Sequence, residues 1–230
     1  QQNLIIQSMG KSIGVIFDMD GVIVHSNPTH KKAIQKFLKE RNQSVSDAYL
    51  ENNVYGCPNK EWMPKLFGKE DPDKLERLAD EKEQLFRDIF VPEDNVVEGI
   101  HDFLEQLGKR NIPMAVATSA PGENADYILS RLAILKYFTA VLDSSDINKG
   151  KPNPEVYIKA AKLLNKRPEE CIVIEDSISG VKAGLNAGAT VIGVTTTHTA
   201  EELSNCHLTI KNFRELDPDN LVNWVLEKQK

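Results

Sequence analysis

Short apolar runs alternate with amphipathic stretches along most of this chain. Six runs rich in β-branched and aromatic residues indicate buried strands, because strands covered on both faces of a parallel sheet are continuously apolar. They cover residues 13–17, 114–117, 138–142, 171–174, 190–194 and 207–210. From about residue 95 these runs alternate with helical patterns, which favours parallel pairing. The predicted fold class is therefore α/β, with a doubly wound parallel sheet.

Helices in this second part of the chain are indicated by apolar residues spaced three and four positions apart. They lie near residues 100–107, 156–164, 181–187 and 219–227. Gly188 follows the third of these helices, in the position that favours a left-handed C-cap. We interpret the first three as crossover helices between parallel strands and the last as a terminal helix.

A purely helical pattern interrupts the alternation after the first strand. Residues 29–41 and 72–90 each place apolar side chains on one helical face, and a shorter helix is expected near residues 60–67. Asp71 fits the N-cap of the longest helix, and Pro72 fits its first helical position. No strand pattern lies between these helices, so we interpret them as one insertion.

The expected domain organisation follows from this interruption. Residues 9–27 and 93–230 form the α/β core, and residues 28–92 form an inserted α-helical domain. We expect residues 1–8 to lie outside the fold. With 230 residues, of which 40% are apolar and 27% charged, the chain can bury a full core and one sizeable insertion.

Charge and cysteine content exclude several classes of function. A net charge of −6 argues against a nonspecific nucleic-acid binder or a protein bound to anionic membranes, although a local cation can still attract a phosphate. Cys57, Cys171 and Cys206 lack metal-ligand spacing, so we expect reduced thiols in a cytoplasmic protein. The sequence has no segment long enough to span a membrane, and its first residues lack the pattern of a signal peptide.

Polar residues suited to chemistry follow four of the predicted strands. Ligands in open α/β sheets bind outside the carboxyl ends of the strands, so these residues should meet at one edge. They are Asp18 and Asp20 after the first strand, Thr118 and Ser119 after the second, Lys151 beyond the third, and Glu175 with Asp176 after the fourth. Together they supply a nucleophile, an anion clamp and oxygen ligands for a hard divalent cation. This set favours phosphoryl transfer through a carboxylate, with Asp18 as the nucleophile.

At these motifs the chain resembles the haloacid dehalogenase superfamily, most closely its β-phosphoglucomutase-like group of phosphatases and phosphomutases. The resemblance runs from Ile13 to about Val194, and its motifs are residues 17–22, 118–119, 150–155 and 175–177 with Gly180. It implies a Rossmann-like core in which residues 28–92 are the small α-helical cap.

The resemblance also implies roles for these residues. Asp18 would carry an aspartyl-phosphate. Mg²⁺ would be held by Asp18, the backbone carbonyl of Asp20, and the pair Glu175 and Asp176. Phosphate oxygens would be held by Thr118 and Lys151. Ser119 would contact phosphate through its backbone N–H, or would simply start the next helix.

Asp20 has a separate task that follows from the chemistry. A leaving alkoxide needs a proton, and the water that later attacks the aspartyl-phosphate must lose one, so a single carboxyl group can serve both half-reactions. A halide needs no proton. The dehalogenase branch of the family lacks this second Asp, and its presence at position 20 disfavours dehalogenation.

Several further residues are candidates near the cap. Ser26 and His30 lie where the family joins core to cap, so they are either hinge residues that face the site or an exposed first helical turn. The loop around Gly56 and Pro58 either places side chains over the site or is a plain helix connection. Asn59 appears there in place of the Arg by which β-phosphoglucomutase grips the distal phosphate of its intermediate, with Lys60 adjacent.

The position after the hydroxyl motif is Pro121, where the mutase carries a Lys. We expect His25 to be a surface or hinge residue, Lys149 to be solvated, and His101, His198 and His207 to be structural. The chain therefore lacks both the Arg and the Lys of the mutase. This disfavours a mutase, because an Arg gives a planar grip on phosphate that Asn does not reproduce.

The sequence therefore predicts a Mg²⁺-dependent phosphatase that acts on a small phosphorylated metabolite. The alternative within the family is a β-phosphoglucomutase-like phosphotransferase that isomerises a sugar phosphate. A phospho-accepting receiver module would share the acidic pocket and the Thr/Lys pair, but it needs neither the helical insertion nor Asp20. We expect neither nucleic acid nor membrane as a partner, and a monomeric state.

Overall fold

Six parallel strands form one sheet in the computed structural model, which describes residues 13–68 and 71–228. The strand order is β3-β2-β1-β4-β5-β6, with β1 and β4 at the centre. Their bounds are β1 (Gly14–Phe17), β2 (Met114–Ala117), β3 (Ala140–Leu142), β4 (Cys171–Glu175), β5 (Thr190–Val194) and β6 (Leu208–Ile210). The doubly wound parallel sheet expected from the sequence is confirmed.

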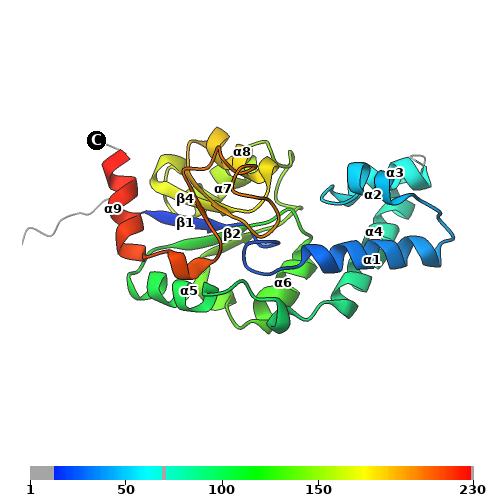
Figure 1. Ribbon diagram of the computed structural model, residues 1–230, viewed down its shortest axis with the longest axis horizontal. Helices are drawn as coiled ribbons and strands as arrows, with labels where there is room; N and C mark the ends of the chain where they lie inside the picture. The colour runs from blue at the N-terminus through cyan, green and yellow to red at the C-terminus, as the bar shows by residue number, and fades with distance from the viewer. Residues whose placement is uncertain (1–12, 69–70, 229–230) are drawn as a thin grey trace, which may run out of the picture.

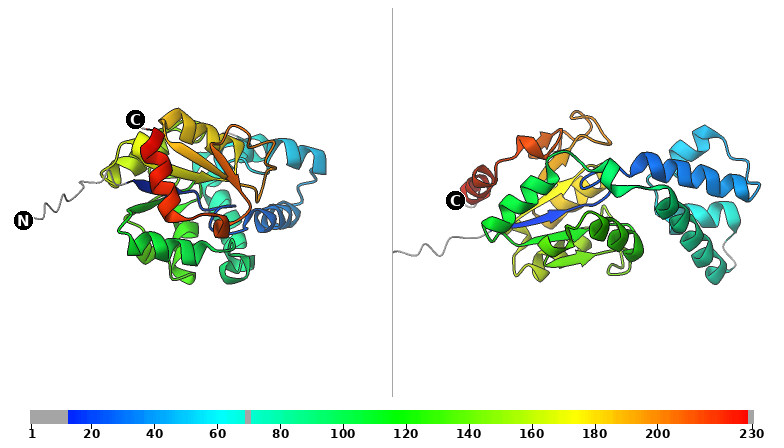
Figure 2. Two further views of the ribbon diagram at one scale, coloured as in Figure 1. Left: turned by 60° about the vertical axis from the view of Figure 1, so that its left-hand side comes forward. Right: turned by 90° about the horizontal axis from the view of Figure 1, so that it is seen from below.

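Helices cover both faces of this sheet (Figures 1 and 2). One face packs against α5 (Ile100–Lys109), α6 (Gly122–Arg131) and α9 (Pro218–Lys228), and the other against α7 (Glu155–Leu163) and α8 (Ile178–Ala187). Successive residues of β1 point to opposite faces, so Val15 and Phe17 join the first layer and Ile16 joins the second. This double cover explains why the strands are continuously apolar.

The remaining helices follow β1 and form a separate helical block (Figure 1). They are α1 (Asn27–Glu40), α2 (Asp47–Asn53), α3 (Asn59–Phe67) and α4 (Pro72–Ile89). These helices enclose their own apolar cluster, which includes Phe37, Leu50 and Trp62. Asp71 is the N-cap of α4, as expected, since its side chain accepts a hydrogen bond from the backbone N–H of Lys74 (3.0 Å). The domain boundaries at residues 28 and 92 stay a prediction, and residues 9–12 lie outside the described residues.

The chain crosses between the sheet and the helical block twice, and the two crossings lie side by side. Val24, on the way out, forms an antiparallel bridge with Val96, on the way back. The His25 backbone N–H donates to the Asn95 carbonyl oxygen (2.7 Å), and the Val97 N–H donates to the Ile23 carbonyl oxygen (3.0 Å). The block therefore leaves and rejoins the core at one point.

The sequence analysis gave no bounds for two of the α-helices. Helix α2 has seven residues and buries one of them, Leu50, so it has no apolar face to detect. Helix α6 starts at Gly122, directly after Pro121, in a Pro-Gly pair that is typical of turns, and the polar Asn124 lies on its buried face. Strands β3 and β6 begin at Ala140 and Leu208, two residues and one residue later than expected.

No helix among the described residues is both long and apolar enough to cross a membrane.

Candidate active site

The first acidic residue of the site, Asp18, directly follows β1 and is 7% exposed. Its backbone N–H donates to the Ile174 carbonyl oxygen on β4 (2.9 Å), which continues the sheet pairing by one residue. The chain then turns sharply at Gly21, whose φ is +82°. A Cβ at Gly21 would lie 1.9 Å from Asp176 Oδ2, so the turn needs glycine both for its backbone conformation and for space.

The second acidic pair stands at the end of β4, next to β1 in the sheet. Glu175 is fully buried and Asp176 is 3% exposed. Glu175 Oε2 accepts hydrogen bonds from the backbone N–H groups of Asp176 (3.0 Å) and Ser177 (3.1 Å) and from the Ser177 hydroxyl (3.0 Å). Gly180 leaves room for this carboxylate, because a Cβ there would lie 1.7 Å from Oε1.

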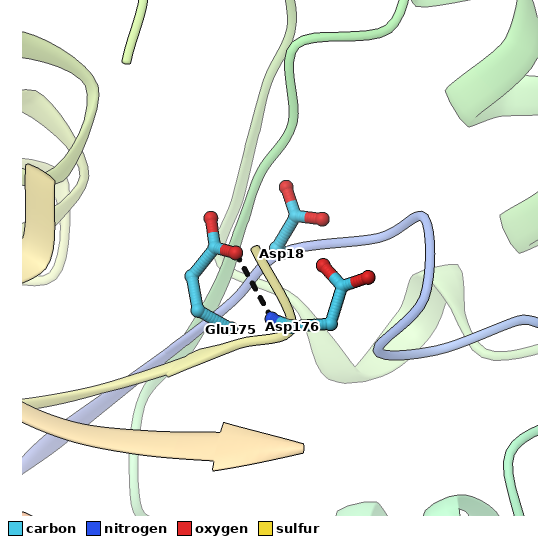
Figure 3. A group of neighbouring side chains, drawn as sticks. All are labelled: Asp18, Glu175 and Asp176. Atoms are coloured by element: carbon cyan, nitrogen blue, oxygen red, sulfur yellow. Dashed lines mark hydrogen bonds between the residues drawn. The ribbon is translucent and has the colours of Figure 1, made fainter. Parts of the chain in front are cut away.

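Asp18, Glu175 and Asp176 together form a cluster of three buried carboxylates, each offering one oxygen atom within 4.8 Å of the others (Figure 3). Burial, followed by repulsion from Glu175, raises the pKa of Asp176 to about 7. Burial is also the largest cause that raises the pKa of Asp18 well above its usual range, and it outweighs the attraction of Lys151. Crowded carboxylates with elevated pKa values are typical of a cation site.

Lys151 supplies a positive charge to this cluster. Its ammonium donates hydrogen bonds to Asp18 Oδ1 (2.6 Å), Glu175 Oε1 (2.7 Å) and the Ala117 carbonyl oxygen (3.2 Å). Burial is the largest influence on the pKa of Glu175 and raises it, but the charge and hydrogen bond of Lys151, with the hydrogen bonds from Tyr157 and the Ser177 N–H, together hold that pKa below the usual range. Tyr157 also donates to Glu175 Oε1 (2.6 Å), so both oxygens of Glu175 are occupied by hydrogen bonds.

Thr118 and Ser119 follow β2 and line an open cavity of about 520 Å³ together with Asp18, Asp20, Lys151 and Asp176. Thr118 is 1% exposed, and its hydroxyl accepts a hydrogen bond from the Ala120 N–H (3.0 Å). The structure thus brings the residues predicted from the strand ends to one edge of the sheet.

Asp20 points toward the start of the helical block, where both hinge candidates contact it. The Ser26 hydroxyl donates to Asp20 Oδ1 (2.5 Å), and His30 Nε2 lies 3.5 Å from the same oxygen. Burial raises the pKa of Asp20, but the hydrogen bonds from His30 and Ser26, with the nearby charge of Lys82, bring it below its usual value. Ser26 is fully buried, so the structure does not match the exposed helical turn that was the alternative for it.

The sequence analysis missed two charged residues next to His30. The Lys82 ammonium lies 3.3 Å from His30 Nδ1 and donates to Glu83 Oε1 (2.7 Å), while the His30 ring stacks on Phe86 at 3.7 Å. Lys82 falls on the apolar spacing of α4, between Ala79 and Phe86. The sequence did contain a signal for this cluster: Lys82 is charged, although the helical period predicts an apolar residue at its position.

The candidates Asn59 and Lys60 lie at the start of α3 rather than in a loop. Asn59 Nδ2 donates to Glu83 Oε1 (2.7 Å), and Asn59 Oδ1 accepts from the Trp62 indole (3.2 Å). Lys60 is exposed. From this part of the helical block, Tyr55 and Gly56 line the cavity, whereas Asn59 and Lys60 do not.

A second missed segment follows β5. The Thr197 hydroxyl donates to Asp176 Oδ2 and accepts a hydrogen bond from Asn27 Nδ2 (2.8 Å), and His198 Nδ1 lies 3.1 Å from the Asp176 carbonyl oxygen. Both residues line the cavity. The rule that identified Asp18 applies here as well, since Thr197 lies just beyond the carboxyl end of a parallel strand.

Three curated proteins and one solved structure show what this chain is similar to. It is 34% identical over 76% of its length to a phosphorylated carbohydrates phosphatase from Thermotoga maritima, and it covers 81% of that protein. It is 32% identical over 78% of its length to β-phosphoglucomutase from Bacillus subtilis, of which it covers 82%. It is 29% identical over 89% of its length to the chloroplastic 5-amino-6-(5-phospho-D-ribitylamino)uracil phosphatase of Arabidopsis thaliana, but it spans only 55% of that longer protein.

The fold agrees with these relatives. The crystal structure of a family IA, variant 3 HAD hydrolase from Entamoeba histolytica superposes with a TM-score of 0.84 at 30% identity, covering 93% of this chain and 99% of that one. The sequence profile of the haloacid dehalogenase-like hydrolases matches residues 15–194. This chain therefore belongs to the haloacid dehalogenase-like hydrolase family.

Proposed function

We propose that this protein is a Mg²⁺-dependent phosphatase that hydrolyses a small phosphorylated metabolite through an aspartyl-phosphate on Asp18. One observation carries the proposal: the Asp18 carboxylate lies in the cavity wall, 2.6 Å from the Lys151 ammonium and beside Asp176. The relatives from Thermotoga maritima and Arabidopsis thaliana are phosphatases by name, which supports the same reaction class.

The reaction has two half-reactions at Asp18. In the first, a carboxylate oxygen of Asp18 forms a bond to phosphorus, the ester P–O bond breaks, and the leaving oxygen takes a proton from Asp20. In the second, Asp20 removes a proton from water, which attacks the phosphorus; the P–O bond to Asp18 breaks, so that inorganic phosphate leaves and the Asp18 carboxylate is restored. Lys151 and Thr118 hold the phosphoryl oxygens.

The carboxylate cluster fits Mg²⁺, which prefers hard oxygen ligands. Asp18, Asp176 and the Asp20 carbonyl would hold the ion. Glu175 was also expected as a ligand and offers one oxygen to the same cluster, while its hydrogen bonds fix Lys151 and the Asp176 backbone. When bound, Mg²⁺ would neutralise the charge shared by the carboxylates and the phosphate dianion.

The helical block would act as the cap that covers the cavity and selects the leaving group. Tyr55 and Gly56 line the cavity from this block. The expected substrate is therefore small enough to fit between these residues and the strand ends.

The direct test is phosphate release from a panel of phosphorylated metabolites, with Mg²⁺ and with EDTA. We expect release with Mg²⁺ and none with EDTA, and a loss of about 10²- to 10⁴-fold in Asp20→Asn. Phosphate release that survives complete metal removal, or an unchanged rate in Asp20→Asn, would contradict the proposed mechanism.

The mutase is the second candidate, since the Bacillus subtilis relative is a β-phosphoglucomutase by name. Asn59 is committed to Glu83 and Trp62, and Lys60 does not line the cavity, so neither supplies a grip on a distal phosphate. We therefore expect β-glucose 1-phosphate, with β-glucose 1,6-bisphosphate as primer, to give inorganic phosphate or no reaction. Accumulation of glucose 6-phosphate without phosphate release would make the mutase the answer.

A further inference from the structure

A buried polar cluster joins the helical block to the core at a distance from the carboxylate cluster. It contains Lys82 and Glu83 on α4, which are 4% and 5% exposed, and the fully buried Asn124 on α6. Burying an ion pair between two helices is expensive compared with packing apolar side chains there. The cost indicates that these residues do more than hold the two helices together.

Glu83 lies at the centre of this cluster. Its Oε1 accepts from the Lys82 ammonium (2.7 Å) and from Asn59 Nδ2 (2.7 Å), and its Oε2 accepts from Asn124 Nδ2 (2.8 Å). Arg87 NH1 donates in turn to Asn124 Oδ1 (2.7 Å). One carboxylate therefore connects α3 and α4 of the helical block to α6 of the core.

The cluster leads to Asp20 through two contacts. The Lys82 ammonium can only donate, so it fixes His30 Nδ1 as an acceptor at 3.3 Å. The ring N–H then lies on Nε2, which faces Asp20 Oδ1 at 3.5 Å. Phe86 holds the ring in this orientation by stacking on it. A change in how α4 sits on α6 would move Lys82, His30 and Asp20 in sequence.

We propose that Glu83 and Asn124 are positioning residues that couple the seating of the helical block on the core to the orientation of the Asp20 carboxyl group. The inference rests on the proposed function, because it gives Asp20 the task of proton transfer to the leaving group. Glu83 holds the Lys82 ammonium against His30, and Asn124 holds Glu83 against the core. The docking of α4 on α6 thereby becomes a condition for efficient proton donation.

Leaving-group dependence tests this proposal. An alkyl phosphate needs a proton on its leaving oxygen, whereas p-nitrophenyl phosphate leaves as a stable anion and needs little help. The variants are Glu83→Gln, which keeps the shape and removes the charge, and Asn124→Ala, which removes the bridge to Glu83. Glu81→Gln is the matched control, since Glu81 lies on the same helix and pairs with Arg41 at an exposed position.

We expect kcat/KM for the alkyl phosphate to fall relative to p-nitrophenyl phosphate in both test variants, by up to about 10²-fold. Glu81→Gln should keep the wild-type ratio. Both rates are measured in one preparation, so a partly unfolded variant changes both rates equally and leaves the ratio intact. Thermal unfolding of each variant reports the structural effect separately.

A double-mutant cycle with Asp20→Asn completes the test. If Glu83 acts through Asp20, adding Glu83→Gln to Asp20→Asn should cost little further alkyl phosphate activity. A ratio in Glu83→Gln and Asn124→Ala equal to that in Glu81→Gln, or full additivity with Asp20→Asn, would overturn the inference while the proposed function stands. An Asp20→Asn variant with undiminished activity would instead overturn the proposed function.

Discussion

Two lysines with buried side chains, Lys151 in the core and Lys82 in the helical block, each place an ammonium next to a carboxylate, but the carboxylates reach them by different routes. Lys151 contacts Asp18 and Glu175, which stand at the ends of the neighbouring parallel strands β1 and β4. Lys82 contacts Glu83 on its own helix and His30 on α1. The core cluster is positioned by strand pairing, and the block's cluster by the contact between helical faces.

This difference separates a part of the molecule with fixed geometry, the strand ends, from a part that can shift, the packed helices. Paired strands hold their ends rigidly, which suits a nucleophile and a cation site that must keep a fixed geometry. Helices that pack across an interface can shift, which suits residues that respond to the position of the block. The comparison can be tested by removing members of each cluster in turn.

The largest effect should come from Asp18→Asn, because it removes the proposed nucleophile. We expect turnover to fall by more than about 10⁴-fold, with no phosphorylated protein detectable by mass spectrometry after rapid quenching. Asp143→Asn is the control, since Asp143 follows β3 and does not line the cavity. Turnover in Asp18→Asn close to that of the control would show that Asp18 is not the nucleophile.

The next effect separates the two lysines by stability. Lys151→Met leaves Asp18 and Glu175 buried without their cation, which should lower the free energy of unfolding by about 3–5 kcal/mol. Lys82→Met should lower it less, because Glu83 keeps its hydrogen bonds from Asn59 and Asn124. Urea unfolding in EDTA measures both values. Equal losses would show that the two clusters are energetically alike.

A smaller effect concerns the pH dependence of stability in the metal-free protein. The pKa of Asp176 is about 7 in the folded protein, well above its usual value near 4 in an unfolded chain. Between these two values the folded protein keeps a proton that the unfolded chain has lost, so the free energy of unfolding falls as pH rises through this window.

Asp176→Asn should remove this loss. We expect the variant to gain up to about 4 kcal/mol over the wild type at pH 8 and little at pH 4, since the pKa differs by about three units and one unit corresponds to about 1.4 kcal/mol. Thermal or urea unfolding in EDTA across pH 4–8 measures the gain, with the exposed Asp80→Asn as control. A gain that does not depend on pH would show that carboxylate crowding is not its cause.

The smallest effect should come from Tyr157→Phe, which removes one hydrogen bond to Glu175 and leaves those from Lys151 and Ser177. The free energy of unfolding should fall by about 1 kcal/mol, with KM unchanged, because Tyr157 does not line the cavity. A large rise in KM would mean that Glu175 contributes directly to substrate binding.

The same comparison explains what the sequence could predict. Asp18, Thr118 and Glu175 follow apolar strands, and parallel pairing brings such positions together whatever the intervening chain does. The strands and most helices could likewise be predicted from the spacing of apolar residues. Thr197 follows the same rule after β5 and could have been found by applying it once more.

Lys82 and Asn124 could not be placed in this way. Whether these two residues come close together depends on how α4 packs against α6. The bounds of α6 could not be predicted either, because the helix begins at a Pro-Gly pair that indicates a turn. Asn59 shows the same limit, since its position suggested substrate contact and its side chain bonds to Glu83 instead. Contacts between helical faces depend on packing angles that local patterns do not encode.

The two segments that connect the sheet to the helical block lie next to each other, so the block could be replaced by another insert. Val24 and Val96 already bridge one another, and the His25 N–H already bonds to the Asn95 carbonyl oxygen. A different insert needs only two ends that are close together to join at this point without disturbing the strands. Recombination or protein engineering can therefore exchange the helical block while the strand ends that carry Asp18 and Glu175 keep their positions. Under the proposed coupling, a grafted block would also have to present groups equivalent to His30 and Lys82, and this requirement would limit which blocks the core can accept.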